Sequence, residues 1–296
     1  MGGEGMLGHK LYQVLSQSLD TVATTRRSAA AVSEVPVYRG RAQSVIGGVD
    51  VADFDTVTRA FARAKPSVVV NCIGVVKHLP EGQDPLISLS VNSLFPHRLA
   101  ELCAATGARL IHMSTDCVFS GTKGGYQETD PPDASDLYGR TKLLGEVTQA
   151  GCLTLRTSII GRDFHRDTGL LEWFLSRRGG KVRGYRRMIF SGFPTKRFAE
   201  VIRMIIVRTP ALDGRYHIAS APISKYDLLL KLRDAWKLDV EIEPVDDPAC
   251  DRSLDGTRFR EATHYVAPDW DELVDDLVTD STPYDVWRTQ HATARG

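Results

Sequence analysis

Residues 67–73, Ser-Val-Val-Val-Asn-Cys-Ile, form an apolar run without alternation of polar and apolar positions. Such a run is typical of a strand buried on both faces of a parallel sheet, and it is too short to span a bilayer. Helix-like and strand-like patterns alternate around it until about residue 160, with further strands expected at 109–113 and 152–156. The alternation predicts an α/β fold with a doubly wound parallel sheet and right-handed crossovers.

The alternation ends after Gly161, where basic clusters and glycines follow. We therefore expect two domains in this chain of 296 residues. Residues 1–161, joined by about 195–220, are expected to form the larger domain. Residues at about 162–194 and 221–296 are expected to form a smaller C-terminal substrate-binding domain.

Charge and cysteine content exclude several classes of protein. The 37 Lys and Arg residues balance the 37 Asp and Glu residues, so no net charge draws the chain to nucleic acid or to an anionic membrane. Glycines occupy the N-terminal region where the apolar core of a signal peptide would lie. The five cysteines share no CxxC spacing, which favours reduced thiols in a cytoplasmic protein and gives no support to a metal site.

Glycines at positions 2, 5 and 8 fit the pattern GxxGxxG directly before a helix-like segment. The backbone at Gly2, Gly5 and Gly8 can approach a pyrophosphate, and the helix N-terminus offers amide donors. The alternative is a common glycine turn in a flexible tail.

The first strand of the expected sheet is truncated. In a doubly wound sheet a central strand leads into the phosphate loop, but only Met1 precedes Gly2. Each unpaired buried backbone group on the neighbouring strands would cost on the order of 1–3 kcal/mol. We therefore expect the native chain to begin roughly six to ten residues upstream with an apolar β-branched run.

Two arginines, Arg26 and Arg27, follow a short strand expected at 21–25, where the adenosine ribose of a dinucleotide would lie. Arginine can pair with a 2′-phosphate, so the pair favours NADPH, with NADH possible. A solvated basic loop is the alternative. Asp50 either accepts a hydrogen bond from an adenine amino group or caps the following helix.

The loop after residues 67–73 carries Gly74, Lys77 and His78. Gly74 would let the backbone pass close to a cofactor. Lys77 and His78 either contact a substrate or are solvated. Asn92 falls inside an apolar helix expected at 88–106, where its amide needs a hydrogen-bond partner.

Thr115 follows the strand expected at 109–113, and Tyr138 and Lys142 lie four residues apart in a helix-like segment. This spacing places Tyr138 and Lys142 on one helical face. A nearby ammonium lowers the pKa of a phenol, which can then act as a general acid. With the Thr115 hydroxyl bound to the same carbonyl oxygen, the three side chains can polarise a ketone for hydride attack.

Five blocks follow one another along the chain: Ser114-Thr-Asp-Cys-Val-Phe-Ser-Gly121, Tyr126-Gln-Glu128, Tyr138-Gly-Arg-Thr-Lys142 with Gly145-Glu146, Leu155-Arg-Thr-Ser158 and Gly192-Phe-Pro-Thr195. Together they resemble the extended short-chain dehydrogenases/reductases, and more closely the dTDP-4-dehydrorhamnose reductase group. The resemblance covers most of the chain. It implies a Rossmann-type NAD(P)-binding fold for the larger domain.

The resemblance also implies residue roles. Cofactor contacts are expected at Gly5, Met6, Leu7, Asp50, Val51 and the turn formed by Cys72, Ile73 and Gly74. Thr115, Tyr138 and Lys142 become the catalytic set, and Thr115 and Asp116 would also meet the sugar. Cys117 stands where these reductases usually have tyrosine, and Ile159 where they often have an aromatic residue, so the particular sugar stays open.

The activity expected from this resemblance is NADPH-dependent reduction of a 4-keto group on a nucleotide-activated 6-deoxysugar in the cytoplasm. The substrate's diphosphate would be bound by basic side chains of the segment from Arg177 to Arg187, or by Arg252. The alternative is that these basic residues form a solvated surface. One alternative is an epimerase or dehydratase of the same superfamily, although Asp116 is followed by Cys117 and not by a second acid. Another is a non-catalytic subunit that resembles the regulatory subunit of methionine adenosyltransferase. A homodimer is possible, and nucleic-acid or membrane partners are not expected.

Overall fold

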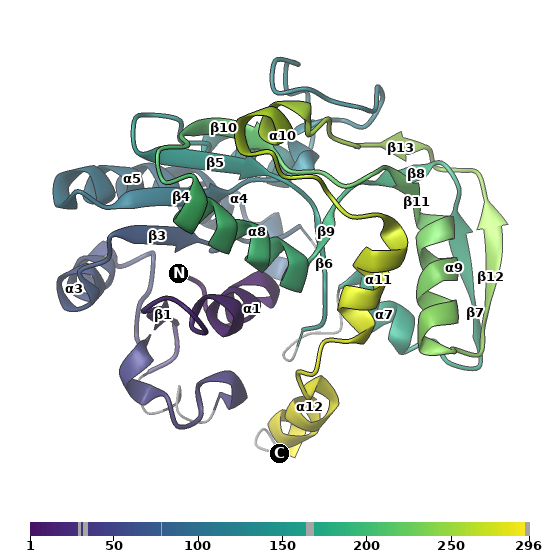
Figure 1. Cartoon of the computed structure of the whole chain (residues 1–296), viewed down its shortest axis with the longest axis horizontal. Coiled ribbons are helices and arrows are strands. Elements are labelled where there is room, and N and C mark those ends of the chain that lie inside the picture. Colours follow the sequence, from purple (N-terminus) through teal and green to yellow (C-terminus); the bar gives the residue numbers. More distant parts are fainter. Residues whose placement is uncertain (29–30, 32–34, 78, 164–168, 294–296) are drawn as a thin grey trace. The chain divides into compact units, whose positions relative to one another are not determined.

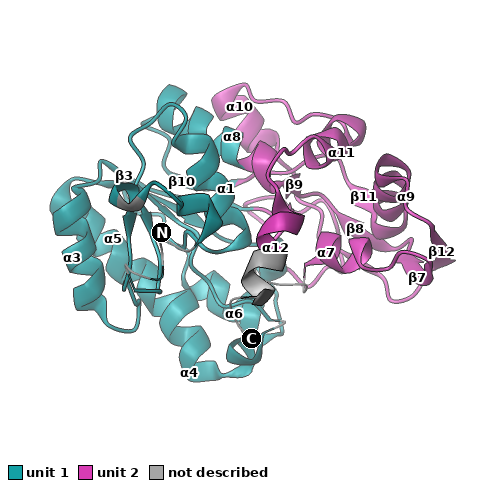
Figure 2. Cartoon of the chain, turned by 90° about the horizontal axis from the view of Figure 1, so that it is seen from below, with its two compact units in different colours: residues 1–118, 132–156, 199–216 teal, residues 119–131, 157–198, 217–296 magenta. Residues whose placement is uncertain are grey.

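The computed structural model describes residues 1–28, 31, 35–77, 79–163 and 169–293 (Figure 1). Contacts divide the chain into two compact units (Figure 2). Unit 1 comprises residues 1–118, 132–156 and 199–216, and unit 2 comprises residues 119–131, 157–198 and 217–296. No helix within the described ranges is long and apolar enough to cross a bilayer.

The largest sheet of the described chain has four strands in the order β10-β5-β4-β3. Its strands are β3 (Val68–Asn71), β4 (Arg109–Met113), β5 (Cys152–Arg156) and β10 (Gly214–His217). β3 and β4 are parallel, and β4 and β5 are parallel. The predicted α/β fold with a parallel sheet is therefore confirmed, and β3, β4 and β5 fall in the segments that the sequence predicts.

Helices alternate with these strands in unit 1. They are α1 (Met6–Leu15), α3 (Phe54–Ala64), α4 (Pro85–Ser88), the π-helix η4 (Leu89–Leu94), α5 (Phe95–Thr106), α6 (Leu137–Leu144) and α8 (Thr195–Arg208), the last from residue 199 onward. Phe61 of α3 and Leu99 of α5 pack with Val69 of β3 and Leu110 of β4 in one buried core. This packing buries one face of β3 and β4, which explains their apolar sequences.

The single helix expected at 88–106 is in fact interrupted by the π-helix η4. Asn92 lies in this π segment, and its Oδ1 accepts a hydrogen bond from the Val75 N–H (2.9 Å). Its Nδ2 donates to the Val75 carbonyl (3.0 Å). The buried amide thus finds both partners in the loop after β3, at a type of helix irregularity that is frequent at functional sites.

Residues 1–3 lie between two strands of unit 1. The Met1 nitrogen donates to the Val70 carbonyl (2.6 Å), and the Met1 carbonyl accepts from the Cys72 N–H (3.3 Å). On the other side, Gly3 N–H donates to the carbonyl of Thr24 (2.9 Å), in β1 (Ala23–Thr24), which pairs in parallel with β2 (Val45–Ile46). In the described part of the chain no strand precedes α1.

Unit 2 contains three small sheets among its described residues, in the orders β11-β8-β13, β12-β7 and β6-β9. The strands are β6 (Ile159–Ile160), β7 (Gly180–Tyr185), β8 (Met188–Phe190), β9 (Phe193–Pro194), β11 (Ile223–Ser224), β12 (Val240–Val245) and β13 (Cys250–Asp251). The helices are α7 (Leu170–Leu175), α9 (Lys225–Trp236), α10 (Thr257–Thr263), α11 (Trp270–Val278) and α12 (Tyr284–Thr293).

Residues 119–131 belong to unit 2, whereas the sequence analysis places them in the larger domain. Tyr126 explains the difference. Its N–H donates to the Ser253 carbonyl (2.8 Å), and its own carbonyl accepts from the Asp255 N–H (2.7 Å). These bonds join the segment to a part of the chain more than 120 residues away, a pairing that local sequence patterns do not reveal.

Gly145 generates a prediction about the packing of unit 1. It caps the C-terminal end of α6, and a Cβ atom there would overlap the Asn92 carbonyl group. Gly145→Ala is therefore expected to lower the free energy of unfolding by about 1–3 kcal/mol, the usual range for overpacking. Thermal and urea unfolding measure the effect. Gly256→Ala is the control, because its Cβ would meet no atom closer than 3.5 Å; equal destabilisation by the two variants would contradict the prediction.

Candidate active site

Thr115 lies just beyond the carboxyl end of β4, where a short 3-10 helix, η5 (Asp116–Val118), begins. Its Oγ1 accepts a hydrogen bond from the Cys117 N–H (3.1 Å) and donates to Asp116 Oδ1 (3.0 Å). The side chain is buried. These bonds hold the Thr115 hydroxyl in one orientation at the end of the sheet.

Helix α6 carries Tyr138 and Lys142 one turn apart, as the sequence predicts. The Asp136 side chain caps the helix by accepting from the Gly139 N–H (2.7 Å), so the first turn that contains Tyr138 is fixed. The Tyr138 hydroxyl is hydrogen-bonded to the Thr115 side chain. The structure therefore brings these two predicted catalytic side chains into direct contact.

The pKa of Tyr138 differs from the expectation. Burial and the nearby Cys117 thiol raise the pKa of Tyr138 well above its usual value, and the hydrogen bond with Thr115 opposes the shift only in part. The expectation of a lowered tyrosine pKa is therefore wrong for the free chain. A tyrosine in this state stays protonated at neutral pH and can donate a proton.

The Lys142 ammonium is buried and donates to the Met113 carbonyl at the end of β4 (2.7 Å). Burial lowers the pKa of Lys142 to about 8, and the Glu146 carboxylate opposes this shift. A Cβ atom on Gly74 would lie 3.8 Å from Nζ. Lys142 therefore lies beside the glycine turn that the sequence assigns to the cofactor.

Helix α1 begins at Met6, with Gly5 as its N-cap. Among the described residues no cap hydrogen bond comes from a side chain, so the Met6 and Leu7 amides are available at the positive end of the helix dipole. A Cβ atom on Gly8 would overlap the Gly2 carbonyl, so only glycine allows the loop to fold this tightly against the helix. The loop suits a pyrophosphate group.

The turn after β3 uses most of its amides internally. The Cys72 N–H donates to Met1, the Ile73 N–H to Asn71 Oδ1 (3.1 Å), and the Val75 N–H to Asn92. Within the described ranges, the exposed Gly74 N–H has no partner. Of the predicted turn contacts, Gly74 is thus the one whose backbone is free to meet a ligand.

The predicted adenosine contacts lie at the surface of unit 1. Arg26 is exposed, whereas Arg27 Nε pairs with Glu4 Oε1 in the glycine loop (2.8 Å). Asp50 Oδ1 accepts from the Ala52 N–H (3.0 Å), and the N-cap of α3 is Asp53, so Asp50 does not cap the helix. Val51 is half-buried and packs against the core.

The predicted substrate contacts receive little support from geometry. Among the described residues no hydrogen bond or ion pair joins Lys77 to the catalytic side chains, and His78 lies outside the described residues. In unit 2, Lys181 pairs with Glu241 (3.0 Å), and Arg186 with Asp246 (3.0 Å). Arg252 donates to the Phe119 carbonyl (2.8 Å). In the basic segment that the sequence suggests for a diphosphate, Lys181 of β7 and Arg186, which directly follows β7, are therefore already paired with carboxylates.

The sequence analysis names Glu146 only as part of a family block and assigns no role to its buried carboxylate, which lies one helical turn after Lys142. Glu146 accepts from Ser114 Oγ (2.7 Å), from Arg156 Nε and Nη2 (2.7 and 2.8 Å) and from Arg215 Nη1 (3.1 Å). Burial raises the pKa of Glu146, but the bonds and charge of Arg156 outweigh burial and hold it below its usual value. The charged Arg156 in an otherwise apolar strand was the signal that could have revealed this pair.

Breaking this pair is expected to destabilise unit 1. Glu146→Gln leaves the Arg156 guanidinium buried without its counter-charge, so unfolding should require about 3–5 kcal/mol less free energy. Urea unfolding measures the change. Glu241→Gln, which removes one partner of an exposed pair with Lys181, is the matched control and should leave the unfolding midpoint almost unchanged. A midpoint equally unaffected by both substitutions would contradict the assignment.

Solved structures with a similar fold include a dTDP-4-dehydrorhamnose reductase from Bacillus anthracis in complex with NADP. It has a TM-score of 0.76 at 18% identity, over 95% of this chain and 97% of that chain. A hypothetical dTDP-4-dehydrorhamnose reductase from Sulfolobus tokodaii has a TM-score of 0.74 at 24% identity, over 93% and 97%. At these identities the likeness shows the fold alone, a Rossmann-type α/β fold.

Sequence relatives extend this likeness. A dTDP-4-dehydrorhamnose reductase from Streptomyces griseus is 36% identical over 146 residues, which are 49% of this chain and 42% of that relative. The chain therefore matches less than half the length of that protein. Methionine adenosyltransferase 2 subunit beta from Mus musculus is 26% identical over 264 residues, 83% of this chain and 74% of that relative. The family model for the RmlD substrate binding domain matches residues 1–282, so the chain belongs to that family.

Proposed function

We propose that this chain is an NADPH-dependent oxidoreductase that reduces the 4-keto group of a nucleotide-activated 6-deoxysugar. One observation carries the proposal: Tyr138 and Thr115 are hydrogen-bonded to each other at the end of β4, with the buried Lys142 ammonium one helical turn away. The Streptomyces griseus relative, a dTDP-4-dehydrorhamnose reductase, supports the substrate class. The Bacillus anthracis structure in complex with NADP supports the cofactor.

Each catalytic side chain has a defined task in this reaction. Tyr138 is protonated at neutral pH and donates its proton to the carbonyl oxygen of the substrate. The Thr115 hydroxyl, which donates to Asp116 in the free chain, would turn its one hydrogen to the same substrate oxygen and so orient the carbonyl group. NADPH, when bound, would supply the hydride that adds to the carbonyl carbon, which completes the reduction to an alcohol.

The other parts of the site serve binding. The glycine loop at residues 2–8 and the α1 amides would hold the pyrophosphate of the cofactor. Lys142, beside Gly74, would bind the nicotinamide ribose. Asp116 would contact the sugar ring. We also propose that the enzyme works in the cytoplasm; a homodimer stays a prediction.

A second candidate function is that of a regulatory subunit. The Mus musculus relative, methionine adenosyltransferase 2 subunit beta, shares a match over 83% of this chain. In this alternative the dinucleotide site would bind without turnover, and the chain would act through a partner enzyme. An epimerase or dehydratase of the same superfamily is less favoured, because Cys117 follows Asp116 at the position where the dehydratases tend to have a second acidic residue.

An NADPH oxidation assay with dTDP- and UDP-4-keto-6-deoxyhexoses tests the proposed activity. Net loss of NADPH absorbance with formation of the 4-hydroxy sugar is the expected result. Isomerised sugar without NADPH loss would favour the epimerase. Tight NADPH binding without turnover across the panel, together with capture of a methionine adenosyltransferase, would favour the regulatory subunit.

Tyr138→Phe is expected to lower kcat about 10²-fold or more, because a positioned general acid contributes about 10²–10⁴-fold. NADPH affinity should change little, since the ring still packs. Stopped-flow turnover and fluorescence titration of NADPH separate the two quantities. Tyr12→Phe is a matched control, since Tyr12 lies in α1 and its ring packs against the ring of Tyr38, with centroids 4.9 Å apart. Full activity of Tyr138→Phe would rule out the acid assignment.

Replacing both Arg26 and Arg27 with Ala is expected to weaken NADPH roughly ten- to hundredfold, because a charge-assisted phosphate contact is worth about 1.5–3 kcal/mol. NADH affinity should change much less. Glu4→Gln isolates the contribution of the Arg27–Glu4 pair, because it frees Arg27 for the phosphate and should not weaken NADPH. An equal loss for both cofactors in the double variant would exclude the 2′-phosphate assignment.

A further inference from the structure

Gly3 is a glycine that the GxxGxxG pattern does not specify, since the pattern requires glycine only at positions 2, 5 and 8. Gly3 is buried, and both of its backbone groups are bonded to other parts of unit 1. Its N–H donates to the Thr24 carbonyl of β1 (2.9 Å), and its carbonyl accepts from the Tyr38 hydroxyl (2.7 Å). A Cβ atom on Gly3 would lie 2.2 Å from the Tyr38 oxygen. The close approach of Tyr38 therefore explains why this position is glycine.

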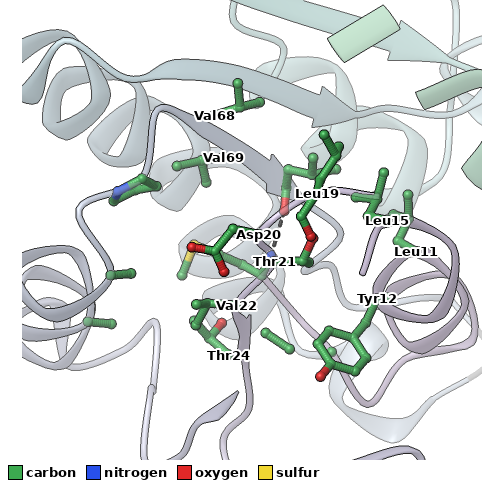
Figure 3. Close-up of a pocket in the computed structure, with 18 of the residues that line it drawn as sticks. Leu11, Tyr12, Leu15, Leu19, Asp20, Thr21, Val22, Thr24, Val68 and Val69 are labelled. Atoms are coloured by element: carbon green, nitrogen blue, oxygen red, sulfur yellow. Dashed lines mark hydrogen bonds between the residues drawn. The ribbon is translucent and has the colours of Figure 1, made fainter. Parts of the chain in front are cut away.

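Tyr38 is held in the connection between β1 and β2. It ends a short 3-10 helix, η1 (Pro36–Tyr38), and its N–H donates to the Val35 carbonyl (2.9 Å). Its side chain is fully buried. The Tyr12 ring packs edge-on against the Tyr38 ring, with centroids 4.9 Å apart. Figure 3 shows Tyr12 on the side of α1 that faces residues 22–24. Packing and main-chain bonding thus fix the direction of the Tyr38 hydroxyl.

The bond from Tyr38 fixes the plane of one peptide in the glycine loop. The Gly3 carbonyl belongs to the peptide whose N–H is that of Glu4. This peptide is trans, so its N–H and C=O point in opposite directions. With the carbonyl turned toward the buried Tyr38, the Glu4 N–H points to the other side of the loop. A flip of the peptide would place a carbonyl oxygen there, which repels an anion. The hydroxyl therefore selects the loop conformation that suits a phosphate group.

Tyr38 keeps its hydrogen at neutral pH and so remains a donor. Burial, and after it the Glu4 carboxylate, raises the pKa of Tyr38 above its usual value. The Glu4 carboxylate itself pairs with Arg27 (2.8 Å). Tyr38 and Arg27 thus hold two successive residues of the glycine loop, Gly3 and Glu4, from the same connection between β1 and β2.

We propose that Tyr38 is a positioning residue for the dinucleotide, because its hydroxyl sets the Gly3–Glu4 peptide in the orientation that receives the pyrophosphate. Tyr38 acts through the loop, which it orders before the cofactor binds, and not by contact with the cofactor. Its effect is equal for NADPH and NADH, since both carry the pyrophosphate. Arg26 and Arg27, by contrast, would meet only the 2′-phosphate. The inference rests on the proposed dinucleotide site and not on the reaction proposed for the chain.

Tyr38→Phe in the full chain tests this role, and Tyr12→Phe is the control, because it removes a hydroxyl from the same ring pair. Calorimetric titration measures the Kd of NADPH, NADH and adenosine 2′-monophosphate, and thermal unfolding without ligand measures stability. Tyr38→Phe is expected to weaken NADPH and NADH alike, about three- to tenfold, the factor that corresponds to one net hydrogen bond. Binding of adenosine 2′-monophosphate, which has no pyrophosphate, should stay unchanged. Tyr12→Phe should change none of the three constants.

Unchanged affinity of Tyr38→Phe for both dinucleotides would overturn the proposal, whatever its Tm. An equal loss for adenosine 2′-monophosphate would overturn it too, because the whole connection between β1 and β2 would then be disturbed. So would a lack of dinucleotide binding by the unmodified chain. A chain that shows the expected changes in Kd but reduces no 4-keto sugar would contradict the proposed reaction and would still support the role of Tyr38.

Gly3→Ala provides a second measurement that does not depend on the stability of Tyr38→Phe alone. The new methyl group would overlap the Tyr38 oxygen, whereas in the double variant with Tyr38→Phe the ring Cζ lies 3.3 Å from it. Gly3→Ala is therefore expected to weaken NADPH more in the unmodified chain than in the Tyr38→Phe background, so the two losses are not additive. Additive losses would overturn the proposal.

Discussion

The buried carboxylate of Glu146 fixes the catalytic helix to the sheet. Its two oxygens accept hydrogen bonds from the end of β4 through Ser114, from β5 through Arg156 and from β10 through Arg215. Glu146 follows α6 directly and lies one turn beyond Lys142. Buried charges need this degree of satisfaction, because an unpaired one costs several kcal/mol. The position of α6 against three strand ends therefore rests on one fully bonded side chain.

The same carboxylate sets the electrostatics of the site. Burial lowers the pKa of Lys142 to about 8, and the negative charge of Glu146 works against a larger shift. Lys142 therefore remains mostly charged at neutral pH, although it is buried. Tyr138 stays protonated for the opposite reason, since burial penalises its anion. Proton donation and positive charge are thus divided between two residues on one helical face, and neither role requires the other residue to titrate.

Local sequence patterns predict the parts of this structure that depend on neighbours along the chain. The β4 and β5 strands were predictable because residues on both of their faces are buried, which leaves no regular alternation of polar and apolar positions. β3 has such a run too, although Val68 and Val70 on one of its faces are only half-buried. The spacing of Tyr138 and Lys142 was predictable from the helical repeat. The grouping of Thr115 with Tyr138 was an expectation of the same kind, because one residue follows a strand and the other begins the next helix, but the hydrogen bond between them was not predicted.

Features that depend on distant pairing were not predictable in this way. Part of the basic segment forms strand β7 because β12, some sixty residues later in the chain, pairs with it. The charged residues Lys181 on β7 and Glu241 on β12 resemble solvated surface residues in the sequence, so the pairing could not be predicted from them. The segment 119–131 joins unit 2 through Tyr126 for a similar reason. The π-helix that contains Asn92 lies within a segment whose sequence pattern is that of an ordinary α-helix. The only sequence signal for it was the polar side chain of Asn92 at a buried position. The pKa of Tyr138 depends mainly on burial of its hydroxyl, and the spacing of residues along the sequence does not show how deeply that group is buried.

Burial of Lys142 also bears on the choice between catalysis and binding alone. An ammonium in the interior loses hydration, and its single described hydrogen bond, to Met113, replaces only part of it. A protein that only binds a dinucleotide could use the glycine loop and Gly74 without the unfavourable desolvation free energy of a buried ammonium, since neither the loop nor Gly74 involves a buried charge. A site that must stabilise charge on a reacting carbonyl oxygen gains from a cation held in a dry place, where its field is strong. The buried Lys142, beside a protonated Tyr138 bonded to Thr115, therefore suits turnover better than storage of a ligand.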